Sequence, residues 1–292
     1  MDTGLRRLTG AQLVAVPGAA VVPWSWELQP LVCSLLLVWA AAYGAGLLRQ
    51  RGERRLPKGT RWRALSFTAG MVLLALALLS PLEAWGDALF AGHMVQHLIL
   101  MMLAPPLLIL GRPVVVALWA LPRGRRHFVG AWWLHNRWSR PAYELLVMPL
   151  SAWLLASAAL WFWHLPRPYA LAFHYPLAHA AEHLSFFFTA VLFWRVVIDG
   201  PRGGRISIAA TMIFVLSYAM QSAMLAAILI FAPRVLYGVH ALGPLWSPLT
   251  PLEDQQLAGV LMWAVMGVVD LIALCLLFVA WLASAARKMA HT

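Results

Sequence analysis

Seven long apolar blocks, separated by short polar or basic segments, constrain the fold of this chain more than any other feature. They lie at 28–48, 63–80, 93–111, 142–163, 178–198, 207–231 and 256–283. The hydrocarbon core of a bilayer is about 30 Å thick and is crossed by a helix of about 20 apolar residues. A helix also satisfies its own backbone hydrogen bonds, which lipid cannot do. The sequence therefore predicts an all-α, polytopic membrane protein built as a bundle of seven transmembrane helices.

Composition and charge agree with this class. Hydrophobic residues make up 62% of the chain and charged residues only 11%, whereas a soluble domain is close to half apolar and about a quarter charged. The net charge of +11 arises from Lys and Arg in the short segments between apolar blocks. Nucleic-acid binding would need a basic face on a water-exposed domain, and the spans leave no room for one. We therefore expect membrane lipid, and no nucleic acid, around this chain.

The basic residues also predict an orientation. Of the 22 Lys and Arg residues, 18 fall in the segments after the first, third and fifth spans and after the seventh. Because basic loops stay on the cytoplasmic side of a membrane, the N-terminus is predicted outside and the C-terminus in the cytoplasm. This divides the chain into an extracytoplasmic segment 1–27, a transmembrane domain 28–283 and a cytoplasmic tail 284–292.

Histidines gather at the predicted outer face. Seven of the ten lie there, namely His93, His97, His164, His174, His179, His183 and His240. Two pairs have helical spacing: HMVQH opens the third span at 93–97, and HAAEH opens the fifth at 179–183. Residues four apart share one face of a helix, with Cβ atoms about 5–6 Å apart, and neutral imidazole is the commonest metal ligand. If these two helices pack together, four imidazoles converge on one metal site.

Neighbouring side chains suggest how such a site would be tuned. Glu182 lies beside His183 and is expected to orient a ligand, to act as a base or charge partner, or only to favour the positive end of its helix. Asp254 opens the seventh span and would either cap that helix or orient a histidine. Met94 lies within the first pair, and thioether together with imidazole favours copper, although methionine is also an ordinary filler of cores.

Aromatic residues near the same boundary are interpreted as a belt that anchors the bundle at the membrane surface. They are Trp24, Trp26, Trp161, Trp163, Trp246 and Tyr169.

Several catalytic signatures are missing from the sequence. It contains no GxSxG, Walker A, GxGxxG or HExxH motif, so we expect a protein that is not an enzyme. Three other interpretations stay open. The histidines of two helices would also hold haem b in a redox protein. They would also hold a metal that activates water in a membrane hydrolase, with Glu182 or Asp254 as the base. In the third, they are merely structural parts of a scaffold.

Three stretches resemble a known family. They are GHMVQHLILMMLAPPLLILGRP at 92–113, HLPRPYALAFHYPLAHAAEHLSFFFTAVLFWRVV at 164–197 and EDQQLAGVLMW at 253–263. Together they are similar to the CtaG-type cytochrome c oxidase assembly factors of bacteria, a multi-span family linked to caa-type oxidases. The resemblance covers most of residues 28–283.

The resemblance implies a function in building the terminal oxidase of the bacterial inner (plasma) membrane. Such a protein would take copper from an extracytoplasmic copper chaperone and help supply it to an oxidase subunit. The residues that match the family's pattern are His93, His97, His164, His174, His179 and His183, with Glu182 beside them, and the acidic-Gln-Gln element Asp254, Gln255 and Gln256.

Overall fold

The structure is a computed structural model that describes residues 24–53, 57–136, 138–240 and 247–289. All regular structure within these ranges is helical. Six helices are long and apolar enough to cross a membrane, and a bent pair makes a seventh crossing when its halves are counted as one span. The prediction of an all-α, seven-span membrane protein is therefore confirmed. Most of the predicted N-terminal segment 1–27 lies outside the described residues.

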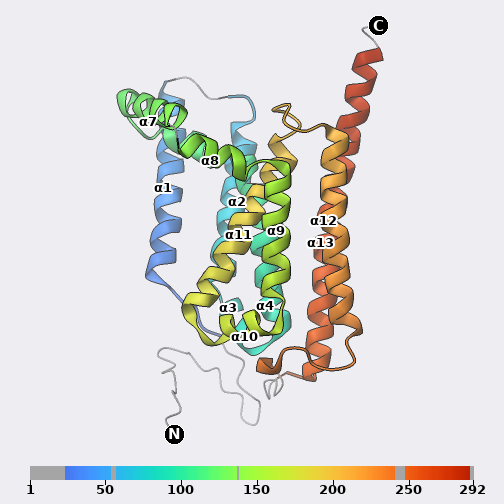
Figure 1. Cartoon of the computed structure of the whole chain (residues 1–292). Helices are drawn as coiled ribbons and strands as arrows, with labels where there is room; N and C mark the ends of the chain where they lie inside the picture. The colour runs from blue at the N-terminus through green and yellow to red at the C-terminus, as the bar shows by residue number, and fades with distance from the viewer. Residues whose placement is uncertain (1–23, 54–56, 137, 241–246, 290–292) are drawn as a thin grey trace.

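Successive crossings run in alternate directions along the bundle (Figure 1). In chain order they are α1 (Pro30–Gly52), α2 (Thr60–Leu79), α4 (Phe90–Leu98) continued by the π-helix η1 (Ile99–Leu103) and α5 (Ala104–Gly111), α8 (Ser139–Leu146) with α9 (Pro149–Trp163), α11 (Pro176–Asp199), α12 (Ile208–Phe231) and α13 (Pro251–Met289). The last helix continues unbroken into the predicted tail 284–292, as far as that tail is described.

Short helices mark the two ends of the bundle. Near one end lie α3 (Leu82–Ala88), α10 (Pro166–His174) and the 3-10 turn η2 (Gly238–His240); near the other lie α6 (Pro113–Leu118) and the basic helix α7 (Arg123–His135) (Figure 1). The two histidine pairs and the arginine-rich α7 thus lie at opposite ends, as the charge pattern predicts. The assignment of the basic end to the cytoplasm stays a prediction.

The fourth span is bent, which the sequence analysis did not anticipate for 142–163. The axes of α8 and α9 differ by 69°. Pro149 is the first residue of α9, and Met148 before it has extended backbone angles (φ −62°, ψ 137°). A residue before proline avoids the helical region, and proline is tolerated in the first turn of a helix, where its missing N–H would be unpaired anyway. The chain therefore turns at this proline.

The third span contains a second irregularity, one turn beyond His97. Pro105 and Pro106 have no backbone N–H, so neither an α-helical nor a π-helical ladder supplies a donor to the carbonyl of Met101. The indole Nε1 of Trp194 on α11 donates to that oxygen instead, at 3.0 Å. This bond fixes α11 against the third span one helical turn beyond His97.

The core divides into two apolar clusters. The larger lies between α4, α9, α11, α12 and α13, and the smaller joins α1 and α2 to α5 and α6. Helix α1 approaches α6 closely at Gly46, where a Cβ atom would collide with the backbone carbonyl of Val116. Tyr43 stacks on Phe67 and donates its hydroxyl hydrogen to the Gly111 carbonyl at 3.0 Å. Helix α1 is thus held mainly at the basic end.

Candidate metal centre

The helix that carries the first histidine pair is fixed at its N-terminus by a distant carboxylate. Asp254 of α13 accepts hydrogen bonds from the backbone N–H groups of Phe90 at 2.7 Å and Ala91 at 3.0 Å. The first N–H groups of a helix have no partner within the helix, and negative charge is favourable there. Asp254 therefore sets the position and depth of His93 and His97.

Of the two expectations for Asp254, the structure contradicts the cap of its own helix; that it orients a histidine stays a prediction. The start of α13 is capped by Thr250 and Glu253 in a capping box. The Thr250 N–H donates to Glu253 Oε2 at 2.8 Å, and the Glu253 N–H donates to Thr250 Oγ1 at 3.3 Å. Because these two residues satisfy α13, the buried carboxylate of Asp254 is left to cap α4.

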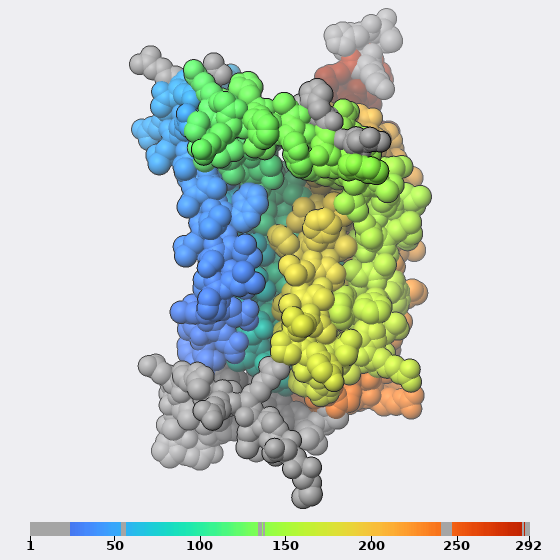
Figure 2. All heavy atoms as spheres, turned by 60° about the vertical axis from the view of Figure 1, so that its left-hand side comes forward, coloured from blue at the N-terminus to red at the C-terminus, as the bar shows by residue number. Residues whose placement is uncertain are grey.

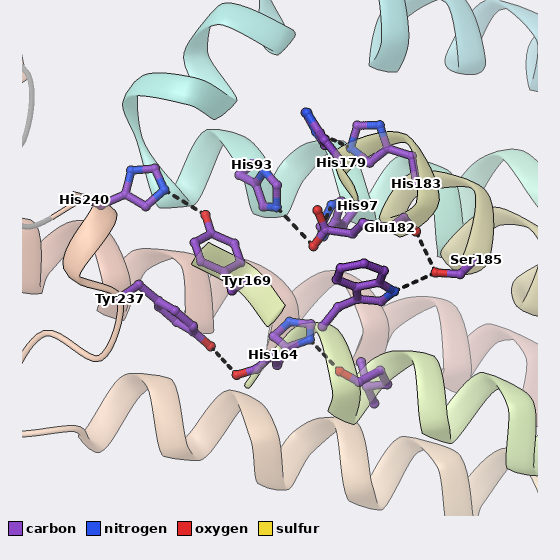
Figure 3. A network of polar contacts seen from close by, with 12 residues as sticks. His93, His97, His164, Tyr169, His179, Glu182, His183, Ser185, Tyr237 and His240 are labelled. Atoms are coloured by element: carbon purple, nitrogen blue, oxygen red, sulfur yellow. Dashed lines mark hydrogen bonds and ion pairs between the residues drawn. The ribbon is translucent and has the colours of Figure 1, made fainter. Parts of the chain in front are cut away.

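Helices α4 and α11 bring the two histidine pairs together (Figure 3). Within the pairs, the ring centroids of His93 and His97 are 4.1 Å apart, and the Nε2 atoms of His179 and His183 are 3.0 Å apart. Between the helices, the ring centroids of His97 and His183 are 5.3 Å apart, and those of His93 and His179 are 5.9 Å apart. The four imidazoles converge as the spacing suggested; that they bind metal stays a prediction.

The tightest part of this cluster consists of His93, His97 and Glu182. The Glu182 Oε1 atom lies 3.6 Å from His93 Nε2 and 3.8 Å from His97 Nε2. The three side chains offer ligand atoms that all lie within 4.8 Å of one another. Two nitrogen or oxygen ligands of a tetrahedral ion with bonds of 2.0–2.1 Å lie about 3.3 Å apart. A small adjustment of these side chains would therefore accommodate an ion.

Burial makes this triad unusual. His93, His97 and Glu182 are 6%, 2% and 1% exposed, and both Nε2 atoms and both carboxylate oxygens have no hydrogen-bond partner. Unpaired buried polar atoms are costly, and a metal ion would satisfy all of them at once. The carboxylate of Glu182 thus lies between two histidines, where it could reach an ion directly, whereas the sequence analysis expected it in a supporting position beside His183.

The second pair is more open and contacts groups that the sequence analysis missed. His179 Nδ1 lies 4.0 Å from Glu83 Oε1 on α3, and Gln96 of the HMVQH motif donates from Nε2 both to Glu83 and, at 2.7 Å, to the Ala77 carbonyl. Burial raises the pKa of Glu83 to about 7, although the hydrogen bond from Gln96 opposes this. A carboxylate behind a histidine is a common way to orient a metal ligand. The sequence feature that could have pointed to Glu83 is its place as an acidic residue in a connecting segment without Lys or Arg.

The remaining predicted ligands lie outside the triad. His164 directly follows α9, with its Nδ1 2.7 Å from the Leu160 carbonyl and its ring centroid 6.1 Å from that of Phe186. His174 is exposed at the end of α10, where its ring contacts that of Phe173. Met94 is buried in the larger apolar cluster. The structure thus brings His164 near the cluster, whereas the ring contact of His174 is with Phe173 on its own helix.

Tyr169 is not the surface anchor that the aromatic-belt interpretation made it. It is 3% exposed, and its ring meets that of His93 edge to face at 5.1 Å. Its hydroxyl lies 2.7 Å from Nε2 of His240, a buried residue whose pKa burial lowers to about 4. The reason is that α10 folds back over the end of the bundle. Tyr169 and His240 therefore form one wall of the cluster.

Comparison with known proteins identifies the family of this chain. A family model described as cytochrome c oxidase caa3 assembly factor matches residues 41–284. Uncharacterized proteins of Mycobacterium bovis and Mycobacterium tuberculosis are each 30% identical to this chain over 205 residues, which cover 66% of this chain and 30% of the relative. One from Mycobacterium leprae is 26% identical over 188 residues, covering 61% and 27%.

The chain thus spans less than a third of the length of these curated relatives. No solved structure matches it. The family model, however, covers most of the chain, including both histidine pairs, Glu182 and Asp254. The chain therefore belongs to the cytochrome c oxidase caa3 assembly factor family of membrane proteins.

Proposed function

We propose that this protein holds copper at the cluster of His93, His97 and Glu182 and helps supply it to cytochrome c oxidase during assembly. The observation that carries the proposal is the convergence of two imidazoles and a carboxylate whose buried polar atoms have no hydrogen-bond partner. Membership of the oxidase assembly family supports the process in which the site would act.

The donor set favours copper over most other ions. Magnesium and calcium prefer all-oxygen sites, whereas imidazole suits copper and zinc, and divalent copper binds a given nitrogen and oxygen site most strongly of the first-row metals. Cytochrome c oxidase incorporates copper, so a factor that assembles the oxidase would need to handle this metal. Copper would therefore be cargo that the protein binds and then transfers to the oxidase.

The graded burial of the histidines suits such a transfer. The triad is buried, whereas His179 and His183 are only partly buried and lie beside it on α11. Copper would exchange from the buried ligands to this second pair, with His164 as a further ligand, and from there to an oxidase subunit. An extracytoplasmic copper chaperone would load the site from the same side. Ligand exchange of this kind needs no nucleophile and no nucleotide, which agrees with the missing catalytic motifs.

Metal analysis of the purified protein tests the proposal. We expect copper in the wild type and only background copper in the His93→Ala/His97→Ala double variant. The matched control is His174→Ala, because that histidine is exposed and its ring contacts Phe173 rather than the triad; its copper content should equal that of the wild type. Unchanged copper in the double variant would overturn the site. A Soret band that disappears in the double variant would instead show that the histidines hold haem.

A further inference from the structure

A groove on the side of the bundle extends away from the metal centre and reaches it only at His183. It has a volume of about 810 Å³ and lies between α1 and α2 on one side and α11 on the other. Figure 2 shows it as a hollow between α1 (blue) and α11 (yellow), beneath α7. Its size falls within the usual range of ligand sites, about 300–1,000 Å³. The groove therefore has room for a small amphiphile.

The walls and the ends of the groove differ in chemistry. Its walls are apolar and include Leu36, Phe187 and Val191. One end, at the basic face of the bundle, is lined by four exposed arginines. They are Arg112, Arg195, Arg202 and Arg205. Among the described lining residues the single acid is Asp199, which lies 3.5 Å from Arg195. A net positive end thus joins an apolar channel that stretches as far as His183.

The dimensions match one leaflet of a membrane. Arg195 and His183 are twelve residues apart on α11, a rise of about 18 Å. Half of a hydrocarbon core about 30 Å thick is about 15 Å. A lipid with its headgroup at the arginines would therefore have acyl chains of suitable length to follow the apolar walls toward His183.

We propose that this groove binds an anionic phospholipid, with its phosphate at the arginines and its acyl chains along α11 and α1. Arginine forms charge-assisted, often bidentate hydrogen bonds with phosphate oxygens, and basic pockets between membrane helices recognise acidic headgroups. A partner helix fits less well, because membrane helices carry their own Lys and Arg at the cytoplasmic end. Such a helix would bring positive charge against the arginines.

The experiment compares retained lipids by native mass spectrometry of detergent-purified protein given equal amounts of phosphatidylglycerol and phosphatidylcholine. We expect the wild type to retain phosphatidylglycerol in preference. In Arg112→Gln/Arg202→Gln/Arg205→Gln, which keeps the Arg195–Asp199 pair, this preference should fall at least tenfold, since each basic residue near a headgroup contributes about fivefold. The matched control is Arg61→Gln/Arg125→Gln/Arg287→Gln, which removes the same charge outside the groove and should keep the preference.

A second variant separates the channel from its charge. Val191→Trp fills the groove and should reduce retention of both lipids, whereas Val268→Trp, on an exposed face of α13, should reduce neither. Equal retention of the two lipids by the wild type, or an unchanged preference in the groove arginine variant, would overturn the proposal. A third outcome would also overturn it: the wild type retains no phospholipid but co-purifies with an oxidase subunit, and Val191→Trp loses that subunit. The occupant of the groove would then be a partner helix.

Discussion

Asp254 in the first turn of α13 binds the start of α4, with its Oδ2 atom 2.7 Å from the backbone nitrogen of Phe90, although 164 residues separate the two along the chain. The second oxygen accepts from Ala91 at 3.0 Å. Through these bonds α13 determines where the helix with His93 and His97 begins. The carboxylate is therefore a positioning group for the candidate metal centre.

Replacing Asp254 by alanine should lower both stability and copper binding. The change removes a helix cap, worth about 0.5–2 kcal/mol, and leaves two buried N–H groups without an acceptor, each of which costs about 1–3 kcal/mol. We expect a loss of at least 2 kcal/mol in thermal unfolding of the purified protein, together with weaker copper binding in a titration. The neighbouring Glu253→Ala removes the exposed cap of α13 and should lower stability less than Asp254→Ala does, without weakening copper binding. Equal losses of copper affinity in both variants would contradict the positioning role.

The variant Glu182→Gln distinguishes two roles of this residue, a metal ligand or a purely structural acid. Glutamine has nearly the same shape but no charge, so copper affinity should fall at least tenfold, the lower end of the effect expected even for a supporting carboxylate. Stability without metal should stay equal or rise, because a buried unpaired carboxylate is itself destabilising. A copper titration and a melting curve of the metal-free protein measure the two effects.

The control for Glu182 is Glu144→Gln, at an exposed acid paired with Arg140 at 2.9 Å, which should change neither quantity. Copper affinity that is unchanged in Glu182→Gln would remove this residue from the proposed ligand set.

Local spacing was sufficient to predict the spans and the two histidine pairs. Four-residue spacing places His93 and His97 on one face of their helix, and His179 and His183 on one face of theirs, independently of the tertiary structure. Apolar length likewise predicts each crossing. The bend at Pro149 also has a local signal in the sequence, because the residue before a proline disfavours helix.

Contacts between distant elements could not be obtained in this way. Glu83 and Tyr169 reach the cluster because the short helices α3 and α10 fold over the end of the bundle. Nothing in the spacing of either residue indicates a partner in another span. The same holds for Asp254, whose own helix supplied a complete capping box and so left its carboxylate for α4.

Trp194→Phe should destabilise the protein through one lost hydrogen bond. The Met101 carbonyl that accepts from the indole has no helical donor, since Pro105 and Pro106 lack N–H groups. A buried carbonyl left unpaired costs about 1–3 kcal/mol, to be measured by thermal unfolding. Trp153→Phe is the control, because its indole donates at 3.0 Å to the Ser217 hydroxyl, which also has the Phe214 carbonyl as a partner. Its loss should be smaller, and equal losses in the two variants would contradict this account of the π-helix.

His240 provides a pH-dependent contribution to stability. Burial lowers its pKa to about 4, against about 6.5 for an unperturbed histidine. Between these values the unfolded chain binds more protons than the folded one, so stability is lost as pH falls from 6.5 toward 4.

His240→Gln should therefore flatten the acid limb of the stability curve. Glutamine keeps a polar group for the Tyr169 hydroxyl, 2.7 Å from the imidazole in the native protein, but has no proton to gain. At pH 5 the solution lies about 1.5 units below the unfolded pKa of about 6.5 and still above the folded pKa of about 4, so His240 has cost about 2 kcal/mol of stability. The fall in melting temperature between pH 7.5 and pH 5 should be smaller in His240→Gln than in the wild type. The control is His127→Gln, at an exposed histidine, which should show the same fall in melting temperature as the wild type. An unchanged pH dependence in His240→Gln would show that His240 takes up its proton as readily in the folded protein as in the unfolded chain.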